Sequence, residues 1–248
     1  MHEGTLPREL ANVASAASDD LALLAGLHDR ELSIDSIRQL AAESPHNWFA
    51  LSLTSEDSRV GFNLLAEYLA QFASQSEDEM TLLDTLAADY ADLYLTFGKR
   101  ISPTESFWLT EDHIERQEPM FEVRRWYRHH GMSARDWRKR SDDHLVLQLD
   151  FVAQLLKEGT TPSCKDAGRF LDRHLRRWSR KFLGGMAEKA TTQFYAGLGL
   201  ITQAILEEVR SIIEEITEEP RTEIATILNA QSTQATDSTL PLGLRSGW

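Results

Sequence analysis

Apolar residues recur with helical spacing in LLDTLAADYADLYLTF, the sequence of residues 82–97. They fall three or four positions apart and so share one face of an α-helix, at Leu82, Leu86, Tyr90, Leu93 and Phe97. The same period recurs over residues 21–40 and 64–72, whereas the two-residue alternation that is typical of β-strands is nearly absent. The sequence therefore predicts an all-α protein.

Capping and helix-ending residues divide the chain into further helices. Capping oxygens or first-turn carboxylates indicate helix starts near Ser33, Ser76 and Ser141. Glycines that can adopt the left-handed conformation indicate helix ends at Gly98, Gly131 and Gly159. We expect shorter helices before residue 50 and longer ones at about 57–74, 79–97, 117–130, 142–158, 164–182 and 186–218.

The expected helices belong to one domain. A chain of 248 residues can bury a sizeable core without being divided. We therefore expect a single-domain helical bundle over residues 1–228. Gly98, Pro103 and Pro119 interrupt the helical pattern and make residues 98–118 the longest predicted loop. The segment 229–248 is rich in Ser, Thr, Gln and Gly, which predicts a flexible tail.

The net charge limits the kinds of molecule that the protein can bind, and the cysteine content indicates the cellular compartment. The net charge of −13 argues against nucleic acid and anionic membranes, which bind cationic surfaces. A single cysteine, Cys164, permits no intrachain disulfide. Residues 1–20 lack the basic start and apolar core of an export signal, and the apolar segment 195–206 is too short to span a bilayer. These features predict a cytoplasmic protein without membrane insertion.

The charges are unevenly distributed along the chain. Residues 56–92 contain nine carboxylates and one arginine, whereas residues 122–140 and 165–181 are both basic. The simpler interpretation is that acidic and basic helices pair on one folded surface. The alternative is that the charges line a functional groove.

Sequence signals of catalysis are weak. The chain has no phosphate-binding Gly-x-x-x-x-Gly-Lys-Ser/Thr, no Gly-x-Gly-x-x-Gly and no Gly-x-Ser-x-Gly, and Gly197-Leu198-Gly199 falls inside a predicted helix. Several side chains are of types that ligate metals, but they lack the helical His-x-x-x-His spacing: Asp112, His113, Glu115, His129, His130 and His144. We therefore expect no catalytic residues, no metal and no cofactor. A helical metal- or nucleotide-dependent enzyme is the alternative.

Five short elements follow one another between Tyr90 and Phe151. They are Phe97-Gly98, Pro103-Thr104-Glu105-Ser106, Val123-Arg124-Arg125-Trp126-Tyr127, His130-Gly131-Met132 and Asp142-Asp143-His144-Leu145. This order resembles the TorD/DmsD/NarJ family of cytoplasmic chaperones, and residues 170–178 and 194–198 extend the resemblance. It implies a TorD-like bundle of about ten helices that acts without catalysis. The implied partner is the precursor of a molybdenum-containing reductase or dehydrogenase, bound through its twin-arginine signal peptide before export by a monomer or a domain-swapped dimer.

The resemblance also implies a signal-peptide site. Its expected members are Asp143, His144, Glu105, Ser106, Trp108, Trp126, Tyr127 and Gln148. In this hypothesis Asp143 receives a peptide arginine, and one or two of the nearby aromatic residues, which include Tyr90 and Phe97, face an apolar groove. The same residues also fit a structural role, in which Asp142 or Asp143 caps a helix, the Pro103–Ser106 segment forms a turn and most aromatics belong to the core.

Overall fold

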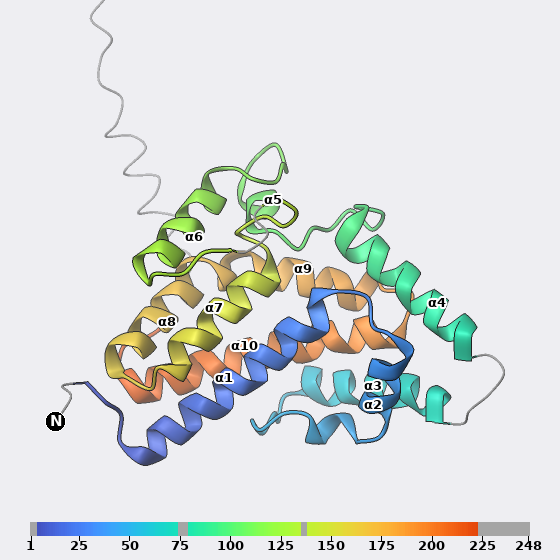
Figure 1. Cartoon of the computed structure of the whole chain (residues 1–248), viewed down its shortest axis with the longest axis horizontal. Helices are drawn as coiled ribbons and strands as arrows, with labels where there is room; N and C mark the ends of the chain where they lie inside the picture. The colour runs from blue at the N-terminus through green and yellow to red at the C-terminus, as the bar shows by residue number, and fades with distance from the viewer. Residues whose placement is uncertain (1–3, 74–78, 135–137, 223–248) are drawn as a thin grey trace, which may run out of the picture.

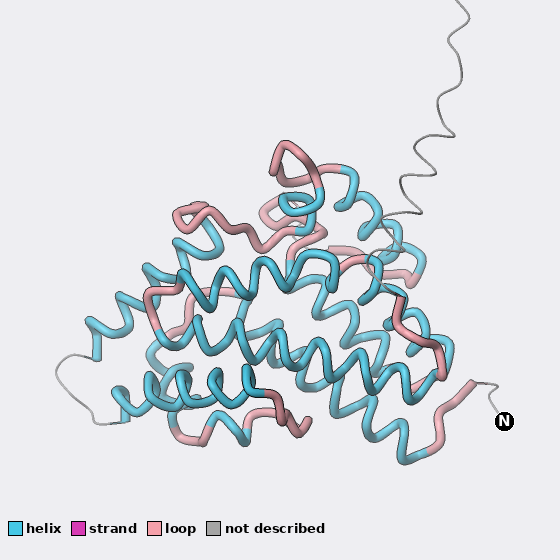
Figure 2. Tube along the Cα trace, turned by 180° about the vertical axis from the view of Figure 1, so that it is seen from behind, coloured by secondary structure: helices cyan, strands magenta, loops and turns pink. Residues whose placement is uncertain are grey.

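The computed structural model describes residues 4–73, 79–134 and 138–222. Within these ranges the regular structure is helical, as Figure 2 shows, and the only β-type pairings are two isolated bridges, Thr5 with Thr160 and Thr104 with His144. The prediction of an all-α fold is confirmed. The segment 229–248, for which a flexible tail was expected, lies outside the described residues.

Ten α-helices and two short helical turns follow one another in the described ranges. They are α1 (Arg8–Asp29), α2 (Ile34–Ala41), η1 (Pro45–Asn47), α3 (Glu56–Ala73), α4 (Glu79–Tyr90), η2 (Ala91–Leu95), α5 (Glu105–Leu109), α6 (Glu118–His129), α7 (Leu145–Lys157), α8 (Thr161–Arg173), α9 (Leu175–Lys189) and α10 (Gln193–Thr217). No helix among them is both long and apolar enough to cross a bilayer.

The long helix α10 lies in the middle of the molecule (Figure 1). It packs against α3, α9, α8 and α1, while α1 also packs along α7. The largest side chains of the core are aromatic residues of α8, α9 and α10, which are almost completely excluded from solvent: Phe170, Trp178, Phe182, Phe194 and Tyr195. Burial of such side chains is the main source of stability in a helical bundle.

Two glycines allow α10 to approach its neighbours on opposite sides. A Cβ at Gly197 would lie 2.6 Å from the backbone oxygen of Gly61 in α3, and a Cβ at Gly199 would lie 2.8 Å from the backbone oxygen of Leu183 in α9. Both distances are shorter than a carbon and a backbone oxygen tolerate. The Gly197-Leu198-Gly199 sequence therefore serves helix packing within α10.

We expect Gly197→Ala to lower the free energy of unfolding by about 2 kcal/mol, because the added methyl group would force α3 and α10 apart. Gly184→Ala in α9 is the matched control. No atom lies within 4 Å of its added Cβ, so the better helix propensity of alanine should leave stability equal or higher. Urea denaturation of the two variants measures the difference in their free energies of unfolding. Equal values would contradict the inference that Gly197 is required for the close packing of α3 against α10.

Several expected boundaries are wrong. The helix expected at 164–182 is interrupted at His174, whose φ of −122° and ψ of −86° are not helical. The helix expected at 186–218 starts only at Gln193, since Thr192 caps it and the two glycines at 184 and 185 are helical within α9. The helix expected at 79–97 is observed as α4 followed directly by η2, which ends at Leu95; the left-handed residue after it is Phe97, with φ of 54°, and not Gly98.

Two further expectations are wrong: the length of the first helix and the pairing of the basic segment 165–181. The first helix, α1, is 22 residues long rather than short. The basic segment 165–181 pairs with α8 itself, with α10 and with the segment that follows α10: Lys165 and Arg169 with Glu219, Arg169 with Asp166, and Arg176 with Asp172 and Glu207. None of these five ion pairs joins the segment to the acidic helices α3 and α4, with which the sequence had suggested that it pairs.

Candidate functional site

The segment before α5 is attached to the start of α7 by backbone hydrogen bonds. The Leu145 amide donates to the Pro103 carbonyl at 2.8 Å, and the Glu105 amide donates to the Asp143 carbonyl at 3.1 Å. These two bonds flank the isolated bridge between Thr104 and His144. Two parts of the sequence about 40 residues apart therefore form one rigid junction. With Gln148, whose side-chain amide donates to the Asp143 carbonyl at 3.0 Å, this junction contains five of the eight expected site residues.

Asp143 has no exposed surface and acts as the acceptor at the centre of this junction. One carboxylate oxygen accepts from the Ser106 amide at 2.7 Å and from the Ser106 hydroxyl at 2.5 Å, and the other accepts from the Ser141 hydroxyl. The carboxylate thus holds the first turn of α5. A peptide arginine would reach it only by replacing these donors.

Glu105 is the second buried carboxylate of the junction. It accepts from the Gln148 side-chain amide at 2.9 Å, and its other oxygen lies 3.0 Å from Nδ1 of His174. Burial raises the pKa of Glu105, and the neighbouring His174 opposes that rise. The contact with Glu105 also accounts for the break between α8 and α9, because His174 leaves the helical path there.

His144 caps α7 and faces a cavity. Its Nδ1 accepts from the Val146 amide at 3.2 Å, so a neutral ring carries its proton on Nε2. Burial lowers the pKa of His144 to about 3, and the nearby Arg140 acts in the same direction. At neutral pH the ring therefore offers a hydrogen-bond donor without a charge. The sequence placed the helix start at residue 142, whereas the cap is His144 itself.

The expected aromatic members lie around this junction in different environments. Trp108 is half-buried and donates from Nε1 to the Ser102 carbonyl at 2.8 Å. Trp126 packs edge-on against Phe170 and His174. Tyr127 is buried, and its hydroxyl donates to the Asp142 carbonyl at 2.9 Å. None of these three lines the large cavity that His144 faces.

That cavity has a volume of about 900 Å³ and is bordered by the end of α1, η2, the segment around Pro103 and the start of α7. Its apolar wall is formed by Tyr90, Tyr94, Leu95, Phe97, Pro103, Val146 and Leu147. Leu95 and Phe97 are 60% and 45% exposed, although apolar side chains of this size are usually buried. Two of the aromatics named from the sequence, Tyr90 and Phe97, therefore border a cavity.

The polar wall of the cavity carries charges of both signs. Its carboxylates are Asp29, Glu115 and Asp150, and its cations are Arg30, Arg116, Lys139 and Arg140. Asp29 accepts from Arg140 and from Nε of Arg30 at 2.7 Å. Burial alone would raise the pKa of Asp29, but the two guanidinium groups outweigh burial and lower it.

Sequence reasoning missed the charged residues of this wall. Asp29 and Arg140 are 111 positions apart, and nothing in the local pattern around either residue indicates that they meet. Leu95 was assigned to a helix and not to a site. The only available signal was an apolar run, residues 93–97, that continues directly into the predicted loop.

A second, smaller cavity has a volume of about 320 Å³. It adjoins the first, because Ser133 and Ala134 line both cavities. Tyr127 lines it together with Arg124, Arg128, Met132 and Asp142. Arg124 forms an ion pair with Asp142 at 2.5 Å. Across the described residues, no group of three His, Cys, Asp or Glu side chains has a geometry that would hold a metal ion.

Three relatives resemble this chain over different spans. The chaperone protein TorD of Vibrio vulnificus (strain YJ016) is 28% identical over 110 residues, and the match covers 44% of this chain and 49% of that protein. The chaperone protein TorD of Escherichia coli O81 (strain ED1a) is 26% identical over 191 residues, 75% of this chain and 90% of that protein. That of Vibrio cholerae O1 (strain M66-2) is 21% identical over 204 residues. The chain thus spans about half the length of the Vibrio vulnificus relative.

A family model described as nitrate reductase delta subunit matches residues 55–184. This range runs from α3 into α9 and contains the α5–α7 junction, Glu105, Asp143 and the partner of Glu105, His174. The resemblance inferred from the ordered elements between Tyr90 and Phe151 is confirmed. Since the match covers more than half of the sequence and includes the whole buried junction, the chain belongs to the nitrate reductase delta subunit family.

Proposed function

We propose that this protein is a non-catalytic maturation chaperone that binds the twin-arginine signal peptide of a molybdoenzyme precursor. The names of its relatives support a chaperone rather than an enzyme. The observation that carries the peptide proposal is the cavity of about 900 Å³, which combines an exposed apolar rim with two half-buried carboxylates, Asp29 and Glu115. Peptide-binding grooves require both features when the ligand has a cationic and an apolar part.

Asp29 supplies the proposed arginine contact. It already accepts guanidinium groups from Arg140, which also donates to the Asp29 carbonyl at 2.6 Å, and from Arg30. Arg30 is 82% exposed, so little holds it besides this ion pair. In the proposal, a peptide arginine takes the place of Arg30 on Asp29, and Arg140 remains. Intrachain arginines thus occupy the place that the peptide would use.

The remaining site residues divide into a contacting and a supporting group. His144 lines the cavity and can donate its Nε2 proton to a peptide carbonyl. Asp143, Glu105, Ser106 and Gln148 lie behind the wall and hold its shape through the buried hydrogen bonds of the junction. Trp108, Trp126 and Tyr127 are proposed to support the same wall from outside the cavity.

Apolar contact must supply most of the affinity. An exposed ion pair contributes about 0.2–1 kcal/mol, whereas micromolar binding requires about 8 kcal/mol. Leu95 and Phe97 offer the apolar surface for the hydrophobic part of the signal peptide. Occupation of this surface would keep the signal peptide from the export machinery until the client enzyme has received its cofactor.

Titration of a twin-arginine signal peptide against surface variants tests the proposal. Leu95→Ser combined with Phe97→Asn should weaken binding about tenfold, because the pair loses apolar contact area worth about 1–2 kcal/mol. Asparagine suits the left-handed backbone of residue 97, so the fold should be unaffected. Met80→Ser is the matched control, since Met80 is 61% exposed and does not line the cavity.

The arginine contact has a test of its own in the same assay. Arg30→Ala should tighten binding of the twin-arginine peptide a few-fold because it removes the internal competitor for Asp29, whereas Asp29→Asn should weaken it. A peptide with both arginines replaced by glutamine should not distinguish Arg30→Ala from the wild type. Equal affinities of all variants for the twin-arginine peptide would refute the assignment of the peptide to this cavity.

A further inference from the structure

A third cavity, lined mainly by polar side chains, lies between α8 and α10, on a different set of elements from the proposed peptide site. It has a volume of about 180 Å³ and is closed by the segment that follows α10. Its charged lining residues are Lys165, Arg169, Asp172, Arg173, Arg210 and Glu219. Four cations thus face two carboxylates, although the whole chain carries a net charge of −13.

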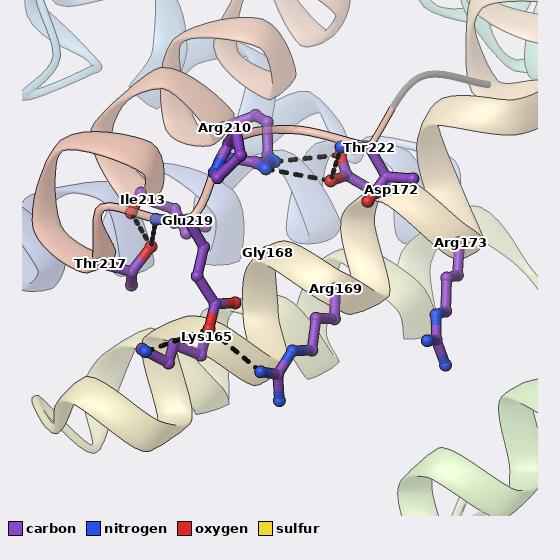
Figure 3. Close-up of a pocket in the computed structure, with 11 residues that line it drawn as sticks. Lys165, Gly168, Arg169, Asp172, Arg173, Arg210, Ile213, Thr217, Glu219 and Thr222 are labelled. Atoms are coloured by element: carbon purple, nitrogen blue, oxygen red, sulfur yellow. Dashed lines mark hydrogen bonds and ion pairs between the residues drawn. The ribbon is translucent and has the colours of Figure 1, made fainter. Parts of the chain in front are cut away.

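One of the two carboxylates is already neutralised by other groups. Asp172 accepts from Nε and Nη2 of Arg210, each at 3.0 Å, and from Arg176 at 2.7 Å, as the close-up in Figure 3 shows for the Arg210 pair. It also accepts from the Thr222 amide at 2.8 Å. Within the cavity, Lys165 and Arg169 are therefore left to Glu219, although Arg169 also pairs with Asp166 at 3.3 Å outside the cavity lining.

Glu219 occupies the cavity as a bound anion would. Its Oε1 lies 3.0 Å from Nζ of Lys165 and 3.1 Å from Nη2 of Arg169, and both contacts are drawn in Figure 3. The hydrogen bond from Lys165 lowers the pKa of Glu219, and Arg169 adds to this effect. Glu219 belongs to the short segment after α10, not to either helix of the cavity. Its hold on α8 consists of two ion pairs that are one-third to one-half exposed, and such pairs are weak.

Arg210 adds an independent sign of a missing ligand. Its side chain is only 2% exposed, yet Nη1 has no hydrogen-bond partner among the described residues. The nearest carboxylate oxygen, on Glu214, is 3.9 Å away, which is too far for a hydrogen bond. Buried guanidinium hydrogens normally have acceptors, because an unpaired buried donor is destabilising.

Gly168 keeps this guanidinium open toward the cavity. It lies on α8 between Lys165 and Asp172, and a Cβ at this position would lie 2.9 Å from Ile213 and 3.9 Å from Cζ of Arg210. Any side chain here would thus fill the space between α8 and the guanidinium. Arg173, by contrast, points away from Glu219 in Figure 3 and is not needed for the site.

From this geometry we propose that the cavity between α8 and α10 binds a phosphate group, which displaces Glu219 and is held by Lys165, Arg169 and Nη1 of Arg210. Guanidinium groups favour phosphate because their planar donors match its oxygens, and a phosphate has acceptors enough for all three cations. Glu219 acts as an internal substitute for the ligand in the unbound protein. The segment 218–222 is then a lid that a phosphate-bearing ligand opens.

Calorimetric titration of the full chain with inorganic phosphate, at constant ionic strength set with chloride, tests this proposal. Glu219→Gln removes the internal carboxylate and should tighten phosphate binding about fivefold or more. Glu218→Gln is the matched control. It makes the same change in net charge one position away, outside the cavity, and should bind phosphate as the wild type does.

Removal of Lys165 or Arg169 should cancel the tighter phosphate binding that Glu219→Gln is expected to give. Arg169→Gln and Lys165→Gln, each added to Glu219→Gln, should abolish it, while the exposed Arg180→Gln should not. Glycerol 3-phosphate in a parallel titration distinguishes a phosphate carried by an organic molecule from the free ion, and tighter binding of either by Glu219→Gln supports the site. The proposal is overturned if Glu219→Gln and Glu218→Gln bind both ligands with equal affinity while their melting temperatures match that of the wild type.

Discussion

Acidification from pH 7.5 to pH 5 should lower the free energy of unfolding by about 4 kcal/mol, because two buried histidines must gain protons when the chain unfolds. His28 and His144 are the residues concerned. His28 has no exposed surface, and its ring nitrogens meet the Tyr94 hydroxyl and, at 2.8 Å, the Thr202 hydroxyl. Burial lowers the pKa of each histidine from 6.5 to about 3.

The direction of the effect follows from these depressed pKa values. Between pH 6.5 and pH 3 the unfolded histidines are protonated and the folded ones are not, so the unfolded state binds more protons. The stability that they contribute is complete above pH 6.5 and is lost as the pH falls through this window. Each histidine accounts for about 2 kcal/mol at pH 5. Asp20 and Glu105, whose pKa values are raised by burial, act in the opposite direction.

Urea denaturation at pH 7.5 and at pH 5 measures the difference. His144→Asn keeps a good capping acceptor for α7 and does not titrate, so it should remove about half of the acid sensitivity. His28→Gln should remove a similar share. The exposed His129→Asn is the control. An acid sensitivity unchanged in both buried variants would show that other groups cause it.

Asp143→Ala should lower the free energy of unfolding by about 3–5 kcal/mol, because three buried donors lose their acceptor at once. These are the Ser106 amide, the Ser106 hydroxyl and the Ser141 hydroxyl. Asp143→Asn should be milder, at about 2 kcal/mol, since one side-chain oxygen remains. Asp84→Asn, on the exposed side of α4 and outside both the junction and the cavity, is the control and should be close to neutral.

The same variants separate support of the wall from direct arginine contact. If Asp143 acts only through the wall, Asp143→Asn weakens binding of the twin-arginine peptide and of its glutamine counterpart by the same factor. If Asp143 receives an arginine, the difference between the two peptides disappears in Asp143→Asn. We expect the first result, measured at a temperature where the variant is folded, because the carboxylate has no exposed surface.

Amphipathic spacing predicted most helices well. Observed bounds of Glu56–Ala73 and Glu118–His129 lie close to the expected ones, because each has a clear apolar face and a clear start. The break at His174 was not predictable, since the residues around it are good helix formers and the cause is Glu105, 69 positions earlier. The start of α10 was available in principle from Thr192, whose side chain caps the helix by accepting from the Tyr195 amide.

The sequence predicted that five of the eight expected site residues lie near one another, but it did not predict their geometry. The order of the short elements identified Glu105, Ser106, Asp143, His144 and Gln148, and the structure brings these together in one junction. The sequence could not indicate which of them would be exposed, since that depends on α7 and α9 closing over α5. It also gave no sign of Asp29, whose contact with Arg140 depends on how the end of α1 meets the segment before α7.

The junction around α5 has a consequence for the order of folding. Its hydrogen bonds close loops of 37 residues between Ser106 and Asp143 and of 69 residues between Glu105 and His174. Contacts so far apart in sequence form later than the helices they join, because chain entropy must be lost before the contacts are gained. During synthesis, the cavity wall can be completed only after α9 has left the ribosome. A growing chain therefore has no finished cavity, and the proposed peptide site would arise only together with the completed fold.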